Sequence, residues 1–359
     1  MQSTITKNNS MSRLSQAVLS QFGLVEETTQ IIPFGSGLIN HTWKVITPEK
    51  DYILQRVNHA VFKDPSAIAY NTKRIANYLK EKHPEYLFVA PVSTKNRNEM
   101  EYLDEGYFRM FPFVAGSHSK DVVETPEQAY QAATQFGRFT QLLNGIDISQ
   151  LKTTIPGFHD LDLRYQQFLT ALKNGNSHRI KEAKTLIDFT ISNADITSTY
   201  KQITTDPAFK QRVTHHDTKI SNVLFDAQDH GICVIDLDTV MPGYFISDVG
   251  DMMRTYLSPV SEEEKDVDKI EVRDDFYQAI VKGYYEEMKD ELTGKEKQHF
   301  FYSGKFMIYM QAIRFLTDYL NNDAYYGAKY PEHNLVRARN QMVLLQRLME
   351  KEKTLATYI

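Results

Sequence analysis

The residues best suited to chemistry lie together in the stretch VTHHDTKISNVLFDAQDHGICVIDLDT, residues 213–239. His215, Asp217 and Asn222 follow the pattern H-x-D-x-x-x-x-N, and Asp236 comes at the end of a later apolar run. An amide oxygen and a carboxylate are hard oxygen donors, which suit Mg²⁺ that takes its remaining ligands from substrate phosphates. A carboxylate on a preceding loop can accept a proton from a substrate hydroxyl. This combination is what phosphoryl transfer requires.

Other chemistries fit the same residues less well. Adjacent His215 and His216 point apart on an extended loop, and no helical H-x-x-x-H spacing supports a transition-metal site. No G-x-S-x-G elbow supports a serine hydrolase. In a purely structural reading, His215 and Asp217 hydrogen-bond the loop and the acids are solvated at strand ends. That reading explains each residue singly, but it does not explain their joint spacing.

The elements that must position these residues are two short strands. Apolar residues 223–225 and the apolar positions of 232–235 flank a turn, which predicts a β-hairpin. Asp217 would then lie on the loop that precedes the hairpin. A hairpin of this design is expected to hold Asn222 and Asp236 side by side at one end.

The rest of the chain divides into a mostly β part and a mostly helical part. Alternation predicts strands within 30–57, at 87–92 and at 107–114, and helical spacing predicts helices at 11–22 and 65–81. After Gly116, helices are expected at 126–144, 160–174, 180–200, 264–290 and 294–321. We therefore predict an α+β fold with a small antiparallel-sheet lobe (1–114), a large helical lobe (115–359) and a ligand cleft between the two lobes.

A glycine turn, GSGLIN at 35–40, interrupts the first strands. It lacks the third glycine of a dinucleotide fingerprint, and strands rather than a helix follow it. Backbone N–H groups at Gly35 and Gly37 could approach phosphate oxygens closely, although an ordinary hairpin turn fits the same residues. Arg56 shares a strand face with Leu54 and could reach those phosphates, or it could be a rim arginine in solvent.

Composition limits the possible partners. The 359 residues carry a formal net charge of −5, which argues against a nucleic acid or an anionic membrane as partner. The single cysteine, Cys233, excludes an internal disulfide and suits a reducing cytoplasm. No apolar stretch approaches the roughly 20 residues that a membrane span requires. We expect a cytoplasmic protein.

The motifs resemble a known superfamily. HHDTKISN followed by VIDLDT is similar to the catalytic segment of the aminoglycoside phosphotransferase and choline kinase superfamily, whose fold is protein-kinase-like. The stretches IDLDTVMPG, SDVGDMMR, RFLTDYLNNDAYY and KYPEHNLVRARNQ further resemble the bacterial N-acetylhexosamine 1-kinases. The likeness covers nearly the full chain.

The resemblance implies a role for individual residues. Asp217 would orient and deprotonate the acceptor hydroxyl, Asn222 and Asp236 would bind Mg²⁺, and Arg56 would hold nucleotide phosphates. His215 would brace the catalytic loop, and Asp248 would tie that loop down. The hinge MFPFVAG would meet adenine through backbone groups, and the acceptor pocket would include two further side chains. These hinge and pocket residues are Pro112, Phe113, Val114, Arg314 and Tyr325.

Two positions depart from the family pattern. The helix at 65–81 has no glutamate near its middle to pair with Arg56, and Asn71 is the nearest polar candidate. Where the related sugar kinases read G-x-G-H-I-N, this chain has Leu38. If that histidine contacts the sugar, one hydrogen bond is lost here and the choice of acceptor differs.

The resemblance implies an ATP- and Mg²⁺-dependent kinase that phosphorylates the anomeric hydroxyl of N-acetylglucosamine or N-acetylgalactosamine. One alternative is a kinase of another small alcohol, such as choline, an aminoglycoside or a plain hexose. Another is a nucleotide-binding regulator without transfer activity, which the missing helix glutamate favours. The preferred hexosamine, the choice between ATP and GTP, and the oligomeric state are left open by the sequence.

Overall fold

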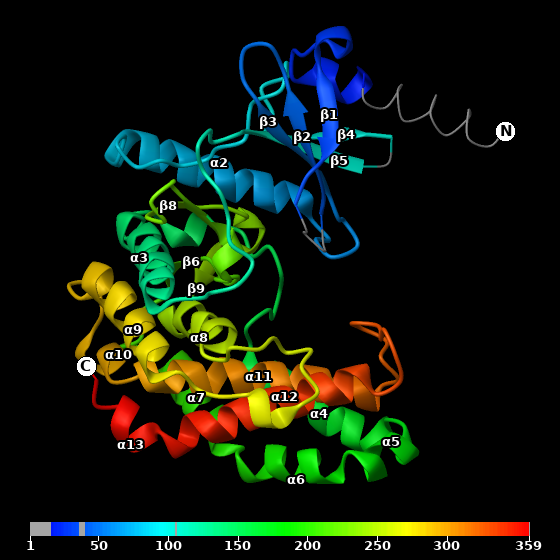
Figure 1. The fold of residues 1–359 in the computed structure, drawn as a ribbon, viewed down its shortest axis with the longest axis vertical. Coiled ribbons are helices and arrows are strands. Elements are labelled where there is room, and N and C mark those ends of the chain that lie inside the picture. Colours follow the sequence, from blue (N-terminus) through cyan, green and yellow to red (C-terminus); the bar gives the residue numbers. More distant parts are fainter. Residues whose placement is uncertain (1–15, 36–39, 105, 359) are drawn as a thin grey trace, which may run out of the picture. The chain divides into compact units, whose positions relative to one another are not determined.

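The computed structural model describes residues 16–35, 40–104 and 106–358, which form two compact units (Figure 1). Unit 1 consists of Met1–His118, Gly145–Ile155 and Ile235–Met241. Unit 2 consists of Ser119–Asn144, Pro156–Val234 and Pro242–Ile359. Gly37 and Leu38 lie outside the described residues, as does the first part of the helix expected at 11–22, of which 16–21 are helical.

Unit 1 is built on a five-stranded antiparallel sheet in the order β1-β2-β3-β5-β4. Its strands are β1 (Gln30–Pro33), β2 (His41–Ile46), β3 (Tyr52–Val57), β4 (Glu101–Leu103) and β5 (Gly106–Pro112). Trp43, Leu54 and Met110 lie opposite one another on neighbouring strands. Because side chains alternate along a strand, this register gathers one apolar face, which packs with Val18 and Leu19 of the N-terminal helix.

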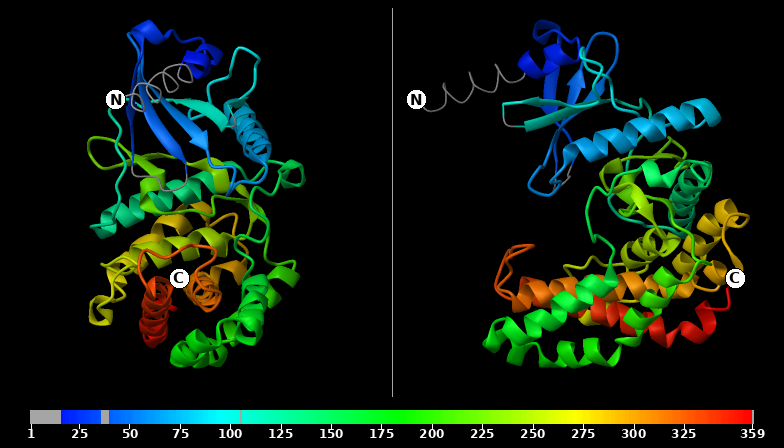
Figure 2. Two further views of the ribbon diagram at one scale, coloured as in Figure 1. Left: turned by 90° about the vertical axis from the view of Figure 1, so that its right-hand side faces the viewer. Right: turned by 180° about the vertical axis from the view of Figure 1, so that it is seen from behind.

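The helix α2 (Pro65–Lys82) lies beside the sheet of unit 1 (Figure 2). It begins where expected, because Asp64 caps the N–H of Ser66 and Pro65 occupies the first turn, where its missing donor costs nothing. The buried residue Ile68 packs with Val57 and Phe62.

The strand expected at 87–92 does not form. Among the described residues, this segment forms one backbone hydrogen bond to the sheet, from Val92 N–H to the carbonyl of Met110 at 2.7 Å. Pro91 has no N–H to donate, so it cannot supply a neighbouring ladder bond. The other predicted strands of the first 114 residues are present.

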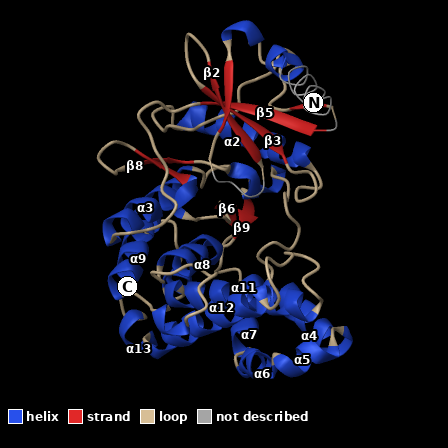
Figure 3. Cartoon of the chain, turned by 45° about the vertical axis from the view of Figure 1, so that its right-hand side comes forward, coloured by secondary structure: helices blue, strands red, loops and turns tan. Residues whose placement is uncertain are grey.

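Unit 2 is mostly helical, as Figure 3 shows. Its longer helices are α3 (Pro126–Leu142), α4 (Leu161–Asn174), α7 (Asp195–Thr205), α8 (Phe245–Tyr256), α9 (Asp274–Met288), α11 (Phe300–Leu320) and α12 (His333–Glu350). Shorter helices are α5 (Ser177–Glu182), α6 (Lys184–Ser192), α10 (Gly294–Lys297) and α13 (Glu352–Leu355). The helix expected at 180–200 is therefore three helices, because the chain leaves helical hydrogen bonding near Ala183 and Asn193.

Helix α11 forms the centre of unit 2 and packs against α4, α8 and α12, while α3 packs along α9. The contact between α3 and α9 depends on Gly283. A Cβ at this position would lie 2.5 Å from the carbonyl oxygen of Tyr130, so only glycine allows the two helices to approach this closely. None of the helices in the described ranges has the length and apolar character needed to cross a membrane.

The predicted hairpin is confirmed. Strand β7 (Val223–Phe225) pairs with β8 (Gly231–Val234) in antiparallel register, Val223 opposite Val234, with an irregularity after Leu224. A second two-stranded sheet joins β6 (Arg212–Thr214) and β9 (Met241–Gly243). The predicted α+β architecture, with a sheet in the first part of the chain and helices in the rest, is confirmed.

Candidate active site

The loop between β6 and β7 carries the predicted catalytic residues of unit 2. Asp217 lies on this loop, ahead of the hairpin as expected, and the short helix η3 (Ile220–Asn222) ends at Asn222. The ring of His215 is buried and lies 5.1 Å from that of Phe136 in an edge-on contact with α3. His216 has a left-handed backbone conformation with φ of 64°, so the chain turns sharply just before Asp217.

Two buried carboxylates of α8 fix the backbone of this loop. Asp248 accepts the N–H groups of His215 at 2.9 Å and His216 at 2.8 Å, and Asp251 accepts the N–H of Thr218 at 2.8 Å. Asp217 is therefore held on both sides. Burial raises the pKa of Asp248 to about 7, although its two backbone bonds oppose that shift, and burial also raises the pKa of Asp251.

The sequence reasoning identified Asp248 but missed Asp251. A signal existed, because the two aspartates stand three residues apart in SDVGD and so lie on one face of a helix. No local pattern shows, however, that this face meets the loop.

Asp217 has an environment that favours its ionised form. Burial acts to raise the pKa of Asp217, but the positive charge of Lys219 and the field of His215 outweigh burial and lower it. The Lys219 ammonium lies 3.0 Å from the carboxylate, whose side chain remains 27% exposed. Asp217 is thus an ionised carboxylate that a small molecule can reach. Lys219 was not singled out from the sequence.

The chemistry of Asn222 and Asp236 suits a divalent cation. The amide nitrogen of Asn222 donates to the backbone carbonyl of Asp217 at 2.8 Å. The amide oxygen of Asn222 is then the atom that can coordinate a metal ion. Asp236 follows β8 by two residues and has a left-handed backbone with φ of 61°. Among the described residues, no three His, Cys, Asp or Glu side chains group as a metal site. Two oxygen ligands remain compatible with Mg²⁺, which commonly completes its shell with phosphates and water.

In unit 1, the segment after Asp236 is anchored to the sheet by a buried ion pair. The guanidinium of Arg109 on β5 pairs with Asp238, and each side chain is at most 4% exposed. The amide nitrogen of Asn40 donates to the same carboxylate at 2.9 Å. Gln55 accepts two N–H groups of Arg109, at 3.0 and 2.8 Å.

Asn71 on α2 also anchors this segment. Its amide nitrogen donates to the carbonyls of Val240 at 3.0 Å and Lys152 at 2.8 Å, and its oxygen accepts the N–H of Lys152 at 2.8 Å. Asn71 therefore does not substitute for a glutamate beside Arg56. Its hydrogen bonds fix the loop that contains Asp238.

The groups of unit 1 that were predicted to contact the nucleotide differ in whether other residues of the chain already bond them. Gly35 has φ of +77°, a conformation that favours glycine. Arg56 lies over the ring of Phe108 and forms no ion pair among the described residues. The N–H of Phe113 is bonded to the carbonyl of Asp51 at 3.0 Å, whereas the N–H of Val114 makes no backbone hydrogen bond within the described chain.

Pro112 ends β5, and the hinge region beside it contains an aromatic and cationic patch. Phe113 contacts Phe34 edge-on at 6.1 Å, and the Lys44 ammonium lies 3.9 Å from the ring centre of Phe113. Phe34 is 42% exposed, which leaves an aromatic face for a ligand. The sequence reasoning did not single out Phe34 or Lys44.

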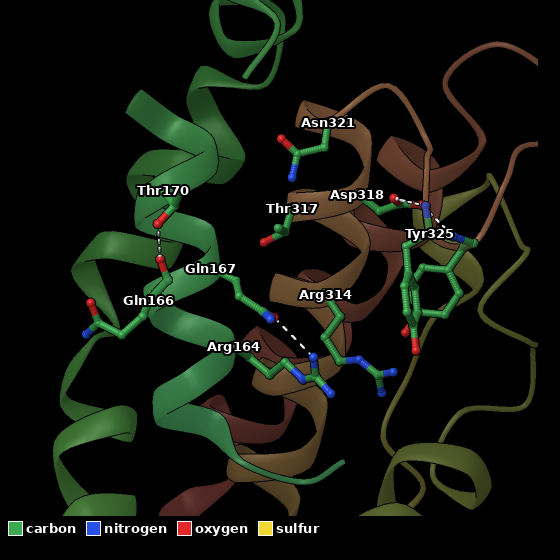
Figure 4. Close-up of a pocket in the computed structure, with 10 residues that line it drawn as sticks. Arg164, Gln166, Gln167, Thr170, Arg314, Thr317, Asp318, Asn321 and Tyr325 are labelled. Carbon is green, nitrogen blue, oxygen red and sulfur yellow. Dashed lines mark hydrogen bonds between the residues drawn. The ribbon is translucent and has the colours of Figure 1, made fainter. Parts of the chain in front are cut away.

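The two predicted acceptor residues line one pocket of unit 2, between α4 and the region from α11 to Tyr326 (Figure 4). The pocket has a volume of about 430 Å³. Its lining residues are Arg164, Gln166, Gln167, Thr170, Arg314, Thr317, Asp318, Asn321, Tyr325 and Tyr326. The Arg314 guanidinium lies 5.5 Å from the ring centre of Tyr326, and the neighbouring Tyr325 is 71% exposed.

Aromatic residues lie between Arg314 of this pocket and the loop between β6 and β7, within unit 2. The Arg314 guanidinium lies 5.6 Å from the ring centre of Phe158, which stacks on His159 at 4.4 Å. The ring of His159 lies 5.2 Å from that of His216, the neighbour of Asp217. Burial, with the positive fields of His216 and Arg314, lowers the pKa of His159 well below its ordinary value, so the ring is neutral at pH 7.

A carboxylate on a loop whose backbone is held by buried acids, followed by an asparagine and a hairpin, is the arrangement of a kinase-like phosphotransferase. The sequence model of the phosphotransferase enzyme family matches residues 30–287 of this chain. The chain therefore belongs to the phosphotransferase enzyme family.

Solved structures support the same class of fold. A microcompartment-associated aminopropanol kinase matches with a TM-score of 0.61 at 14% identity, covering 96% of this chain and 98% of that one. A spectinomycin phosphotransferase bound to ADP and spectinomycin has a TM-score of 0.57 at 14% identity, covering 95% and 98%. A Plasmodium vivax ethanolamine kinase has a TM-score of 0.56 at 15% identity, covering 91% and 86%. These similarities confirm the predicted kinase-like fold.

Proposed function

We propose that this phosphotransferase is an ATP- and Mg²⁺-dependent kinase that phosphorylates the anomeric hydroxyl of an N-acetylhexosamine. The observation that carries this proposal is the state of Asp217: ionised, partly exposed and fixed on both sides by the backbone bonds to Asp248 and Asp251. Such a carboxylate can align a hydroxyl nucleophile and accept its proton. Fold relatives solved with ADP, or known as kinases of small alcohols, support ATP as the donor.

The chain supplies a distinct role for each group in this reaction. Asp217 accepts the hydroxyl proton, and the adjacent Lys219 keeps the carboxylate ionised before transfer. The oxygens of Asn222 and Asp236 would hold Mg²⁺, which offsets negative charge on the phosphates when bound. Arg56 and the backbone of Gly35 and Gly37 would contact phosphate oxygens of the nucleotide.

A carboxylate of low pKa is an adequate base for this acceptor. An anomeric hydroxyl is more acidic than an ordinary alcohol, and in a loose transition state its proton leaves late. Most of the rate acceleration would then come from positioning and charge compensation. The two bonds that Asp248 makes to the loop, and the bond that Asp251 makes, serve such positioning.

The acceptor pocket argues against a cationic substrate. A quaternary amine site requires an aromatic cage, with acids to favour the cation, and an aminoglycoside site requires an acidic rim. Here Arg164 and Arg314 place two guanidinium groups in the pocket. Their charge disfavours choline, ethanolamine and aminoglycosides, although kinases of such acceptors share the fold. A sugar with hydroxyl and acyl oxygens suits arginine and Tyr325 better.

The decisive experiment is an acceptor panel. ADP release is measured with N-acetylglucosamine, N-acetylgalactosamine, glucose, choline, ethanolamine and an aminoglycoside, and the product is analysed by phosphorus NMR for phosphate on the anomeric carbon. Preference for an N-acetylhexosamine with a 1-phosphate product is expected. A faster reaction with an amino alcohol would refute the sugar assignment, and ATP binding with no stimulation by any acceptor would favour a regulator.

Variants test the role of Asp217 in the same assay. Asp217→Asn should lower kcat by roughly 10²–10⁴-fold, the usual contribution of a general base, while nucleotide binding measured by calorimetry is retained. Asp188→Asn is the matched control, because this exposed aspartate of α6 pairs only with Lys184 in the described structure. If a variant at position 217 keeps most of its turnover, Asp217 does not act in the mechanism.

A cytoplasmic location also belongs to this proposal, on the basis of the single cysteine and the ATP requirement.

A further inference from the structure

The pocket between α4 and α11 contains two arginines without carboxylate partners. Neither Arg164 nor Arg314 forms a salt bridge within the described part of the chain. Arg164 instead donates to the carbonyl of Gly157 at 2.8 Å and to the side-chain oxygen of Gln167 at 3.1 Å. Arg314 donates to the side-chain oxygen of Gln311 at 3.1 Å. Both guanidinium groups therefore have only neutral acceptors.

Two other enclosed arginines of unit 2 are paired with acids. Arg212 pairs with Glu296 at 2.7 Å, and Arg254 pairs with Asp251 at 3.0 Å. Arg164 has no such acid partner among the described residues, and its Nε is buried without a hydrogen-bond partner there, as is the Nε of Arg212. Burial and the charge of Arg314 lower the pKa of Arg164, as expected for two cations that repel each other.

Nearby acids form no ion pair with either arginine within the described residues. Asp318 lines the pocket, but its two oxygens accept the N–H groups of Tyr325 at 2.7 Å and Tyr326 at 2.9 Å, and the Asn334 amide at 3.1 Å. Asp160 caps the start of α4 by accepting the N–H of Leu163 at 3.0 Å. The pocket is thus lined by two cations and one carboxylate, and the oxygens of that carboxylate bond neutral N–H donors and not the arginines.

We propose that this pocket binds an oxyanion carried by the acceptor, so that the preferred substrate is an acidic sugar with a free anomeric hydroxyl. The proposal rests on the proposed function and narrows its substrate class. A carboxylate or phosphate group matches the planar, two-pronged donor geometry of guanidinium, and it removes the repulsion between Arg164 and Arg314. A neutral sugar leaves that repulsion in place.

The position of the pocket suits an acceptor that extends from the catalytic loop. Phe158 lies within 5.6 Å of Arg314 and 6.4 Å of the His216 ring, and His216 precedes Asp217. In the proposed binding mode, one small molecule contacts the arginines at its acidic end while its anomeric hydroxyl faces Asp217. The rings of Phe158 and His159 stack on each other between Arg314 and His216 in this series of contacts.

The first test compares neutral and acidic acceptors with the full chain. The probes are N-acetylglucosamine, N-acetylglucosamine 6-phosphate and glucuronic acid, each with a free anomeric hydroxyl. We expect kcat/KM to be at least about tenfold higher for one acidic probe than for the neutral sugar, the value of one charged hydrogen bond. The better of the two acidic probes identifies phosphate or carboxylate as the preferred oxyanion. Equal or lower kcat/KM for both acidic probes overturns the proposal, while turnover of the neutral sugar leaves the proposed function intact.

Variants separate charge recognition from general damage to the site. Arg164→Gln should lower the ratio of acidic to neutral kcat/KM by about tenfold or more. Arg314→Lys retains a charge but loses the two-pronged geometry, so it should lower the same ratio less. Arg339→Gln, which alters an exposed arginine of α12, should leave the ratio unchanged. A ratio that Arg164→Gln does not lower contradicts the proposal.

A direct binding measurement is independent of the kinase reaction. Titration calorimetry with inorganic phosphate, without nucleotide, should show binding that Arg164→Gln weakens by about tenfold and Arg339→Gln does not affect. If no sugar is phosphorylated but this binding is seen, the proposed function fails and the oxyanion site stands. Absence of binding, or equal binding by wild type and Arg164→Gln, overturns the oxyanion site.

Discussion

The buried ion pair between Arg109 and Asp238 offers a quantitative test of how unit 1 is held together. We consider Arg109→Gln. Asp238 is 2% exposed, and after this change its side chain keeps the hydrogen bond from the amide of Asn40. Removing one member of a buried ion pair leaves an uncompensated charge and typically costs about 3–5 kcal/mol. Domains are stable by only about 5–15 kcal/mol, so the loss should be large.

The geometry also predicts what happens when both charges are removed. The double substitution Arg109→Met with Asp238→Leu replaces the pair by apolar side chains of similar size, which is often nearly neutral for buried pairs. The double variant should therefore be more stable than Arg109→Gln. This comparison separates the cost of a stranded charge from the cost of losing a contact.

The assay uses the single tryptophan of the chain. Trp43 lies in β2 opposite Leu54 and packs against the apolar core of unit 1, so its fluorescence reports the unfolding of that unit. With a urea dependence of about 1–3 kcal/mol per molar, Arg109→Gln should lower the midpoint by roughly 1 M or more. Arg56→Gln is the matched control, because Arg56 lies on the adjacent strand β3 and has no carboxylate partner among the described residues.

Two results would refute the reasoning. One is a midpoint for Arg109→Gln that equals the midpoint of Arg56→Gln, which would mean that the Asp238 charge is not costly without its partner. The other is a double variant no more stable than Arg109→Gln, which would assign the loss to packing instead of charge.

Three further predictions concern unit 2. Gly243→Ala should destabilise the protein by about 1–3 kcal/mol in chemical denaturation, because the new Cβ would overlap Thr214 and the His216 ring; an unchanged midpoint would contradict this packing. Burial raises the pKa of the Cys233 thiol to about 12, so alkylation of the native protein at pH 8 should be slow and should accelerate on unfolding, as mass spectrometry can measure. Burial raises the pKa of Asp248 to about 7 from an ordinary 3.8. Between these two pH values, the Asp248 carboxyl is protonated in the folded state and ionised in the unfolded state. The stability of wild type relative to Asp248→Asn should therefore fall as pH rises from 5 to 7 and level off above 7; a difference that does not change with pH would refute this.

Local patterns were enough to predict much of the fold. The sheet strands at 30–57 and 106–112, the helix α2 and the hairpin of β7 and β8 follow from alternation, helical spacing and turn residues. The position of Asp217 on the loop before that hairpin follows from the same pattern. The strand predicted at 87–92 was wrong, because this segment forms one backbone hydrogen bond to the sheet among the described residues and Pro91 lacks the N–H for another.

The contacts that organise the candidate site depend on long-range partners instead. Asp251 reaches Thr218 across 33 residues of chain, and no local signal reveals that contact. The two uncompensated arginines of the pocket are likewise 150 residues apart in sequence, Arg164 on α4 and Arg314 on α11. Sequence periodicity places each residue on a helix, but it does not show which helices become neighbours.

The distance in sequence between Arg109 and Asp238 has a consequence for biosynthesis. The two side chains are separated by 129 positions, so the ribosome releases the strand bearing Arg109 well before the acid that neutralises it. Until residues 235–241 emerge, Arg109 lacks its counter-ion and Asn71 lacks the carbonyl of Val240. A recombinant fragment ending near residue 118 should accordingly express as an unstable, protease-sensitive polypeptide, and unit 1 is completed only after residue 241 has been synthesised.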